Sequence, residues 1–235
     1  MDEILADDDA ETSDYNDSTD NDIDNSNGNV ISLGTERRVG TGRVFPTKFN
    51  PPNPNDTPVS LFPLGRAESV IQYHLYIENG GQNPRAGCCF VYGSPHGYIS
   101  FPLEKQGPTG IPSPQTSNRA ELRAVIAATR YRDWVDEGCR CLVIATDSEY
   151  VVEGMTKWVK VWIRNGWRTS TRVPVKNKDL WRCLLGEVER WDEEGMRIQV
   201  WRIPREWNTE ADEPAKEAAN DGAPQSFGDI CGVLV

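Results

Sequence analysis

The pattern of apolar positions along the chain begins with three short runs rich in β-branched and aromatic residues. Gly, Asn or Pro bounds each run, so the pattern predicts successive strands over residues 70–77, 87–93 and 96–103. Asn79-Gly80-Gly81 is a turn sequence that separates the first two runs. The short connections between the runs favour an antiparallel meander.

The period then changes. Leu122, Val125 and Ile126 recur at helical spacing, which predicts a helix over residues 118–135. Residues 141–145 are all apolar, as is typical of a strand buried on both faces. The remaining predicted elements are a helix from Ser148, a helix over 177–194, a strand over 198–203 and a helix over 209–220. This order predicts an α/β fold with a mixed five-stranded sheet, its first three strands antiparallel, and helices on both faces.

The two ends of the chain differ from this central part. Residues 1–35 contain eleven acids and no Lys or Arg, and such a composition cannot bury enough apolar surface to order itself. We therefore predict a disordered acidic tail over 1–36, either fully solvated or screening a basic surface. Residues 37–69, rich in proline, predict a linker or a strap across the domain surface. The domain itself is predicted over 70–223, followed by a C-terminal tail over 224–235.

The acidic tail accounts for the whole net charge. Of the 36 acids, eleven lie in residues 1–35, so the rest of the chain carries 25 acids and 25 bases. The charge of −11 therefore does not exclude a nucleic-acid-binding protein. The six cysteines have no zinc-like spacing, and we interpret them as reduced thiols of an intracellular protein. We expect no signal peptide and no membrane span, because no apolar run is long enough.

Three carboxylates occupy positions from which they could converge. Glu121 is predicted in the first turn of its helix, Asp147 directly follows the buried strand, and Asp212 is predicted in the first turn of the last helix. Ligands collect at the carboxyl ends of parallel strands, and crowded carboxylates bind Mg²⁺ or Mn²⁺. Each acid alone also fits a structural role, as a complement to a helix dipole or as a helix cap.

Residues 157–178, which we call the handle, contain seven bases and no acids. Three tryptophans, Trp158, Trp162 and Trp167, lie among these bases. Basic side chains with interleaved aromatics favour nucleic-acid binding, although a solvated amphipathic helix with its tryptophans in the core would have the same composition. We expect Trp158 to face the core and Trp162 to contact nucleic acid.

Together these features resemble the type 1 ribonuclease H family. The acidic motifs that carry the resemblance are Asn118-Arg119-Ala120-Glu121-Leu122, Ala145-Thr146-Asp147-Ser148-Glu149-Tyr150 and Glu210-Ala211-Asp212. The handle and its flanks, from Gly154 to Trp181, are similar to the basic handle of eukaryotic-type members. The resemblance implies a ribonuclease H-like fold and an endonuclease that hydrolyses the RNA strand of RNA/DNA hybrids by two-metal catalysis. Its cofactor would be Mg²⁺ or Mn²⁺, bound by Glu121, Asp147 and Asp212.

The resemblance also implies the residues that contact the hybrid. Asn118 would lie near the RNA strand, and Thr116 and Asn177 match positions that hold a DNA phosphate. Pro114 stands where the family usually has an Arg in that phosphate pocket. The expected contacts in the handle are Lys157, Lys160, Trp162, Arg164 and Arg168.

The chain departs from the family in its first strand, where the family carries a catalytic Asp. One placement puts Glu78 at that position and makes it a possible fourth catalytic and metal-binding residue; the other, without a gap, puts Tyr73 there. The His that usually precedes the last acidic motif is also missing from residues 203–208. The alternatives to an active nuclease are therefore a catalytically impaired hybrid-binding protein of the same fold, or a domain derived from a mobile element. We expect a monomer, and the sequence indicates no protein partner.

Overall fold

The computed structural model describes residues 38–53, 55–57, 68–78, 84–92 and 97–232, with residues 68–78 described in their backbone alone. The predicted acidic tail lies outside these ranges. No helix in the described part of the chain is long and apolar enough to cross a bilayer. The six cysteines are free thiols, and five of them are buried.

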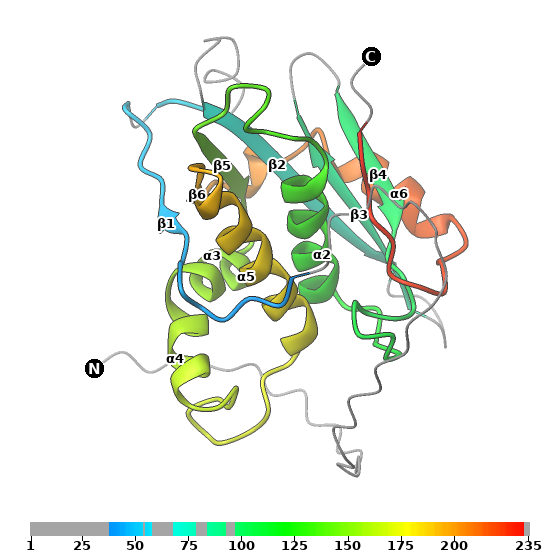
Figure 1. Cartoon of the computed structure of the whole chain (residues 1–235). Coiled ribbons are helices and arrows are strands. Elements are labelled where there is room, and N and C mark those ends of the chain that lie inside the picture. The colour runs from blue at the N-terminus through cyan, green and yellow to red at the C-terminus, as the bar shows by residue number, and fades with distance from the viewer. Residues whose placement is uncertain (1–37, 54, 58–67, 79–83, 93–96, 233–235) are drawn as a thin grey trace, which may run out of the picture. The chain divides into compact units, whose positions relative to one another are not determined.

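The centre of the molecule is a six-stranded sheet with the order β1-β6-β5-β2-β3-β4 (Figure 1). Its strands are β1 (Thr47–Lys48), β2 (Glu68–Glu78), β3 (Arg85–Val91), β4 (Tyr98–Pro102), β5 (Cys141–Thr146) and β6 (Arg197–Arg202). β2, β3 and β4 form the predicted antiparallel meander, whereas β2, β5, β6 and β1 are mutually parallel neighbours. The sheet therefore has one strand more than the five predicted.

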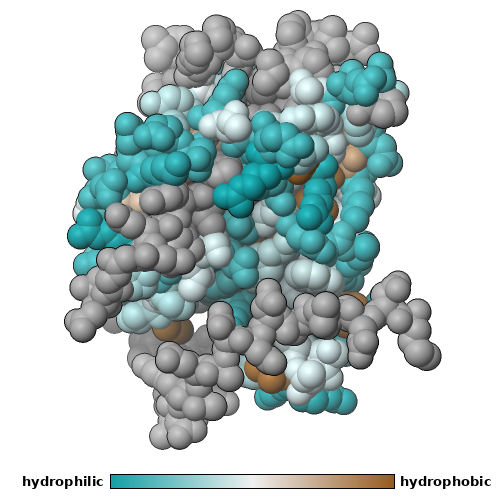
Figure 2. All heavy atoms as spheres, turned by 180° about the vertical axis from the view of Figure 1, so that it is seen from behind, coloured by the Kyte–Doolittle hydropathy of each residue, from teal (hydrophilic) through white to brown (hydrophobic). Residues whose placement is uncertain are grey.

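Helices cover both faces of this sheet. Figure 1 shows α2 (Ser117–Arg130) and α5 (Lys178–Glu193) on one face and α6 (Asp212–Asn220) on the other. Between β5 and α5 the chain forms α3 (Glu149–Glu153), a π-helical turn η2 (Gly154–Trp158) and α4 (Val159–Arg164). A 3₁₀ turn, η3 (Arg205–Trp207), precedes α6. Seen from behind, on the side of α6, the coloured surface is mostly hydrophilic (Figure 2).

Alternation along the strands divides the core between the two faces. In β3, Cys88 packs into the large core beneath α2 and α5, whereas Cys89 joins the small cluster beneath α6. In β5, Leu142 and Val143 likewise enter different clusters, and every residue of this strand is buried. The prediction of a strand buried on both faces is confirmed.

Two predicted boundaries differ from the structure. The first long helix ends at Arg130 and not at Val135, because the Asp133 carboxylate accepts the Asp136 N–H at 3.1 Å and turns the chain. Such a local side-chain bond competes with helix continuation. At its other end the helix begins at Ser117, so Glu121 lies in the second turn instead of the first.

Both flanks pack onto the predicted domain. Residues 38–49, which we call the N-terminal strap, cross α5 and end in β1, which pairs with the exposed edge of β6. Beyond α6, Phe227 is buried, and the Gly228 carbonyl accepts a hydrogen bond from Arg123 at 2.7 Å. The folded unit therefore extends beyond the predicted limits of 70–223 at both ends.

Candidate active site and nucleic-acid interface

Asp147 lies at the carboxyl end of β5, the central parallel strand. Its Oδ1 accepts a hydrogen bond from Asn208 Nδ2 at 2.8 Å. Asn208 follows η3 and is fully buried, so its amide holds the Asp147 carboxylate in one orientation. The parallel strands thus present a fixed carboxylate at the edge of the sheet where ligands bind in open α/β folds.

Glu121 reaches the same edge from α2. The Ser148 hydroxyl donates a hydrogen bond to Glu121 Oε2 and accepts one from the Val151 N–H at 3.2 Å, capping α3. Burial raises the pKa of Glu121; the negative charge of Asp147 raises it further, while the Ser148 bond and Arg205 oppose the shift. The ionised pair of Glu121 and Asp147 is therefore costly by itself, and a cation beside it would lower that cost.

Asp212 is not brought into this pair. It begins α6 and forms an ion pair with Lys216 on the same helix, at 3.0 Å. Among the described residues, no group of three or more His, Cys, Asp or Glu side chains lies close enough to hold a metal ion. The oxygen donors of Glu121 and Asp147 suit a hard divalent cation. The structure thus assembles two of the three predicted ligands.

The strand registers show how the two candidates for the family's first-strand Asp, Tyr73 and Glu78, lie relative to the end of β5. Gln72 pairs with Ala145, so continuing the ladder places Tyr73 opposite Thr146 and His74 opposite Asp147. Glu78 pairs with Arg85 and lies six residues beyond Gln72, about 20 Å along an extended strand. The side chains of β2 are outside the described residues, but this backbone register argues against Glu78 as a ligand and favours the placement of Tyr73.

An open hollow of about 470 Å³ adjoins Asp147. Arg202 and Arg205, from the end of β6 and from η3, line it together with Ile203 and Pro204. Arg202 forms an ion pair with Glu149 at 2.9 Å, so Arg205 is the cation that we expect to bind an anionic substrate here. Sequence reasoning singled out neither Arg205 nor the Ser148 and Asn208 hydrogen bonds, because their partners are distant in the chain.

The predicted phosphate pocket contains a dense polar network. Arg119, whose side chain is buried, binds both Asp179 oxygens at 3.0 and 2.6 Å. It also donates to Asn177 Oδ1 at 3.4 Å, while Asn177 Nδ2 donates to the Tyr150 hydroxyl at 3.3 Å. Asn177 adopts a left-handed conformation with φ of 56° just before α5, which Asn tolerates better than most residues.

The N-terminus of α2 adjoins this network through Arg119. Thr116 is the N-cap residue of α2, is half-buried and makes no side-chain capping bond. Asn118 is exposed on the first turn. Arg119, two residues after Ser117 on α2, thus links the start of this helix to Asn177.

The handle exposes most of its predicted basic contacts. Lys157, Arg164 and Arg168 are exposed, and Lys160 is half-buried with its ammonium 5.1 Å from the centre of the Phe45 ring. Lys157 pairs with Glu153 at 2.6 Å. Lys48 of the N-terminal strap pairs with the other oxygen of that carboxylate, also at 2.6 Å, so one acid serves two cations.

The two tryptophans expected on different sides of the handle, Trp158 and Trp162, pack against each other. Trp162 is half-buried and packs against the main core, with its ring 5.6 Å from that of Trp181. Trp158 is also half-buried but stands outside that core cluster, between the rings of Tyr150 and Trp162 at 6.2 and 5.9 Å. The prediction of Trp158 as the core residue was therefore wrong, and Trp162 has at least a packing role.

Comparison with known proteins identifies the family. The RNase H family profile matches residues 76–220, which is more than half of the chain. The chain belongs to the ribonuclease H family. A ribonuclease H of Idiomarina loihiensis is 41% identical over 150 residues, covering 62% of this chain and 87% of the relative. Ribonuclease H of Crithidia fasciculata is 31% identical over 175 residues, but the match spans just 34% of that longer protein.

A solved structure supports the fold of this ribonuclease H family member. The foamy viral protease-reverse transcriptase in complex with an RNA/DNA hybrid matches with a TM-score of 0.50 and 18% identity, over 65% of this chain and 20% of that one. The comparisons together support a ribonuclease H enzyme with nuclease and nucleic-acid-binding character. The family match includes Glu121, Asp147 and Asp212 but begins after Tyr73 and the N-terminal strap.

Proposed function

We propose that this protein is an endonuclease that hydrolyses the RNA strand of RNA/DNA hybrids with the help of two divalent metal ions. The observation that carries the proposal is the pair of Glu121 and Asp147 at the carboxyl end of β5, held by Ser148 and Asn208. The raised pKa of Glu121 means that this pair gains from a bound cation.

Glu121 and Asp147 would hold the metal, with Mg²⁺ or Mn²⁺ as the fitting ions. Asp212 is the proposed third ligand, and it would have to exchange its ion pair with Lys216 for the cation. Bound ions of this class supply an activated water and stabilise the leaving oxygen. Asn208 keeps Asp147 oriented, and Arg205 would attract a phosphate of the substrate into the adjoining hollow.

The remaining proposed contacts divide between the two strands of the hybrid. Asn118, exposed on α2, would read the RNA strand, where an amide can sense a 2′-hydroxyl. Thr116 and Asn177 would hold a DNA phosphate. The handle would neutralise further phosphates through Lys157, Lys160, Arg164 and Arg168, and the half-buried Trp162 would provide an aromatic contact.

A second candidate function is hybrid binding without efficient cleavage. The observation that favours it is the register of β2, which, continued by one residue, brings Tyr73 to the end of β5 and leaves Glu78 far along the strand. A two-metal site needs ligands for both ions, and a site that lacks one carboxylate should bind the second ion weakly. This candidate keeps the same substrate and the same nucleic-acid contacts.

A substrate panel separates the two candidates. Wild-type protein is incubated with an RNA/DNA hybrid, double-stranded DNA, double-stranded RNA and single-stranded RNA, with Mg²⁺ or Mn²⁺, and binding and cleavage are measured in parallel. The nuclease proposal predicts cleavage of the RNA strand in the hybrid alone. Tight hybrid binding without cleavage in either metal supports the binding protein, and absence of any preference for the hybrid contradicts both.

The cellular compartment is part of the same proposal. All six cysteines are free thiols, and reducing intracellular compartments keep thiols in that state. We therefore infer an intracellular site of action.

A further inference from the structure

A hollow of about 420 Å³ lies between the N-terminal strap, the loop before α2 and the first turns of α5. Arg38 and Val39 of the strap form one wall, Ile111 belongs to the loop, and Lys178 and Arg182 come from α5. Arg38 and Val39 lie outside the residues that match the family profile, whereas the other lining residues lie within them.

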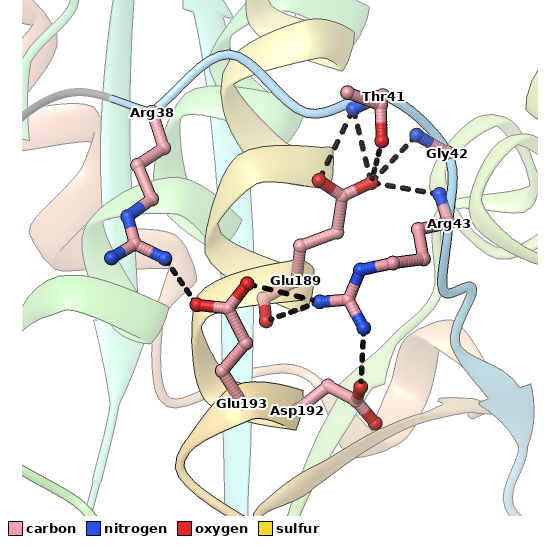
Figure 3. A network of polar contacts seen from close by, with 7 residues as sticks. All are labelled: Arg38, Thr41, Gly42, Arg43, Glu189, Asp192 and Glu193. Atoms are coloured by element: carbon pink, nitrogen blue, oxygen red, sulfur yellow. Dashed lines mark hydrogen bonds and ion pairs between the residues drawn. The ribbon is translucent and has the colours of Figure 1, made fainter.

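The N-terminal strap is fixed where it forms this wall. Glu189 of α5 accepts the backbone N–H groups of Thr41, Gly42 and Arg43 at 3.0, 2.6 and 2.8 Å (Figure 3). Burial opposes ionisation of Glu189, but these backbone bonds outweigh it and lower the pKa, so the carboxylate stays charged. The wall is therefore preformed, and a ligand would bind without ordering it.

Close backbone contact fixes the strap further. The Gly40 N–H donates to the Arg182 carbonyl at 2.9 Å. A Cβ on Gly40 would lie 2.3 Å from the backbone nitrogen of Gly186, so a glycine is needed at the crossing.

The charge of the hollow is positive. Lys178 and Arg182 are one helical turn apart and exposed, and neither side chain has a hydrogen-bond or ion-pair partner among the described residues. Arg38 adds a third cation, which pairs with Glu193. The acid that lines the hollow, Asp179, is already neutralised by Arg119. The two unpaired cations are therefore available to an anionic ligand.

The hollow also has an apolar rim. Val39 is 56% exposed and Ile111 is 63% exposed, although both are large hydrophobic side chains. Apolar side chains next to two cations suit a phosphodiester strand. Its sugars and bases can pack on the apolar surface while its phosphates bind the cations.

The position of the hollow next to Asn177 indicates which strand of the hybrid would bind there. Lys178 directly follows Asn177, and Asp179 joins the hollow to Arg119, which donates to Asn177 Oδ1. The hollow is thus contiguous with the region of Thr116 and Asn177, where the proposed function places a phosphate of the DNA strand.

We propose that this hollow is an additional subsite for the DNA strand, in which Lys178 and Arg182 neutralise the phosphates next to the one held near Asn177. The inference rests on the proposed function, because that function supplies the hybrid and assigns its strands. It extends the proposed DNA contacts from the region of Asn177 to the wall formed by the N-terminal strap.

The test compares wild type with the double variant Lys178→Gln/Arg182→Gln in hybrid binding over a salt series. The matched control is Arg140→Gln/Arg197→Gln. It removes two exposed charges at the amino ends of β5 and β6, the ends that lie away from Asp147. Loss of two phosphate contacts should lower the steepness of log K against log salt by about 1.8. The ratio of wild-type to variant affinity should therefore be about tenfold smaller at 200 mM salt than at 50 mM. The control should keep the wild-type slope.

A second measurement identifies the strand. Hybrids with a single-stranded extension of either the DNA or the RNA strand are compared, with the extension on the side of the hollow. The DNA extension should tighten binding to wild type and not to the double variant, and the RNA extension should have no such effect. If the double variant binds all hybrids as wild type does, or if the control weakens equally, the subsite is contradicted while the proposed function stands. Wild type without affinity for any hybrid would contradict both.

Discussion

Ser148 and Glu121 are joined by a hydrogen bond from the Ser148 hydroxyl to Glu121 Oε2, which ties the start of α3 to the second turn of α2. Ser148 directly follows Asp147 in the chain. The same short segment therefore supplies the Asp147 carboxylate and the hydroxyl that binds the Glu121 carboxylate. The bond favours the ionised form of Glu121, against the burial that raises its pKa. Metal binding requires that ionised form.

Replacing Ser148 with Ala should therefore raise the pKa of Glu121 further. Since cleavage needs the carboxylate, the acidic limb of the pH–rate profile should move to higher pH. Loss of the cap on α3 should also cost about 1 kcal/mol in stability. Ser148→Thr keeps the hydroxyl and should restore the wild-type acidic limb. An unchanged acidic limb in Ser148→Ala would show that this bond does not govern the ionisation of Glu121.

Glu121→Gln should make the metal-free protein more stable at neutral pH. The pKa of Glu121 is higher in the folded state than in the unfolded state. Its neutral form therefore contributes stability that is fully present below the unfolded pKa, about 4.3, and this stability is lost as the pH rises through the folded pKa. Gln is neutral throughout, so its advantage should vanish in acid. Urea unfolding with a chelator at several pH values measures this difference. Added Mg²⁺ should stabilise wild type and not the variant; a variant less stable than wild type at neutral pH would refute the argument.

Arg123 forms a buried ion pair with Glu104 that stabilises the fold. Its side chain is 1% exposed, pairs with Glu104 at 2.6 Å and lies between the rings of Phe101 and Phe227, at 4.8 and 4.3 Å from their centres. Arg123→Ala should destabilise the protein by about 3–5 kcal/mol, because it leaves a buried carboxylate unpaired.

The matched variant for Arg123 replaces both partners. Arg123→Met with Glu104→Met removes the two charges together and should cost much less than Arg123→Ala. Denaturant titration of the two variants measures the difference. Equal losses of unfolding free energy in the two variants would mean that packing of the side chains, and not the ion pair, determines the stability of this region.

Tyr73 provides a gain-of-function test of the first strand. Because the register places Tyr73 beside the end of β5, Tyr73→Asp should add a carboxylate near Asp147 and raise the cleavage rate, most clearly in Mg²⁺. Glu78→Gln should leave cleavage unchanged, since the backbone at Glu78 lies far along β2. The opposite pattern, with loss of activity in Glu78→Gln and no gain in Tyr73→Asp, would restore Glu78 as a ligand.

The sequence predicted most of the sheet and the position of Asp147. The apolar run of β5 and the alternation at Cys88 and Cys89 predict burial directly, because side chains alternate across a strand. The edge strand β1 was not predicted as a strand, because two residues carry no periodic pattern and their pairing depends on the free edge of β6.

The handle shows a second limit of sequence pattern. The π-helical turn Gly154–Trp158 adds a residue to the helical path, which rotates all following side chains by roughly 100° relative to an ideal helix. The expectation that Trp158 faces the core and Trp162 faces nucleic acid came from the neighbouring bases and not from helical spacing; the structure has both rings half-buried and packed against each other. Contacts such as Asn208 with Asp147, 61 residues apart, have no local pattern from which to predict them.

The most direct test of the central claim is the single-turnover cleavage rate of an RNA/DNA hybrid by wild type and Asp147→Asn in Mg²⁺ and Mn²⁺. Asp221→Asn, an exposed substitution of the same type at the end of α6, is the matched control. We expect wild type and the control to cut the RNA strand, and Asp147→Asn to bind the hybrid and cut it at least about 100-fold more slowly. Cleavage by Asp147→Asn at the wild-type rate would contradict the account.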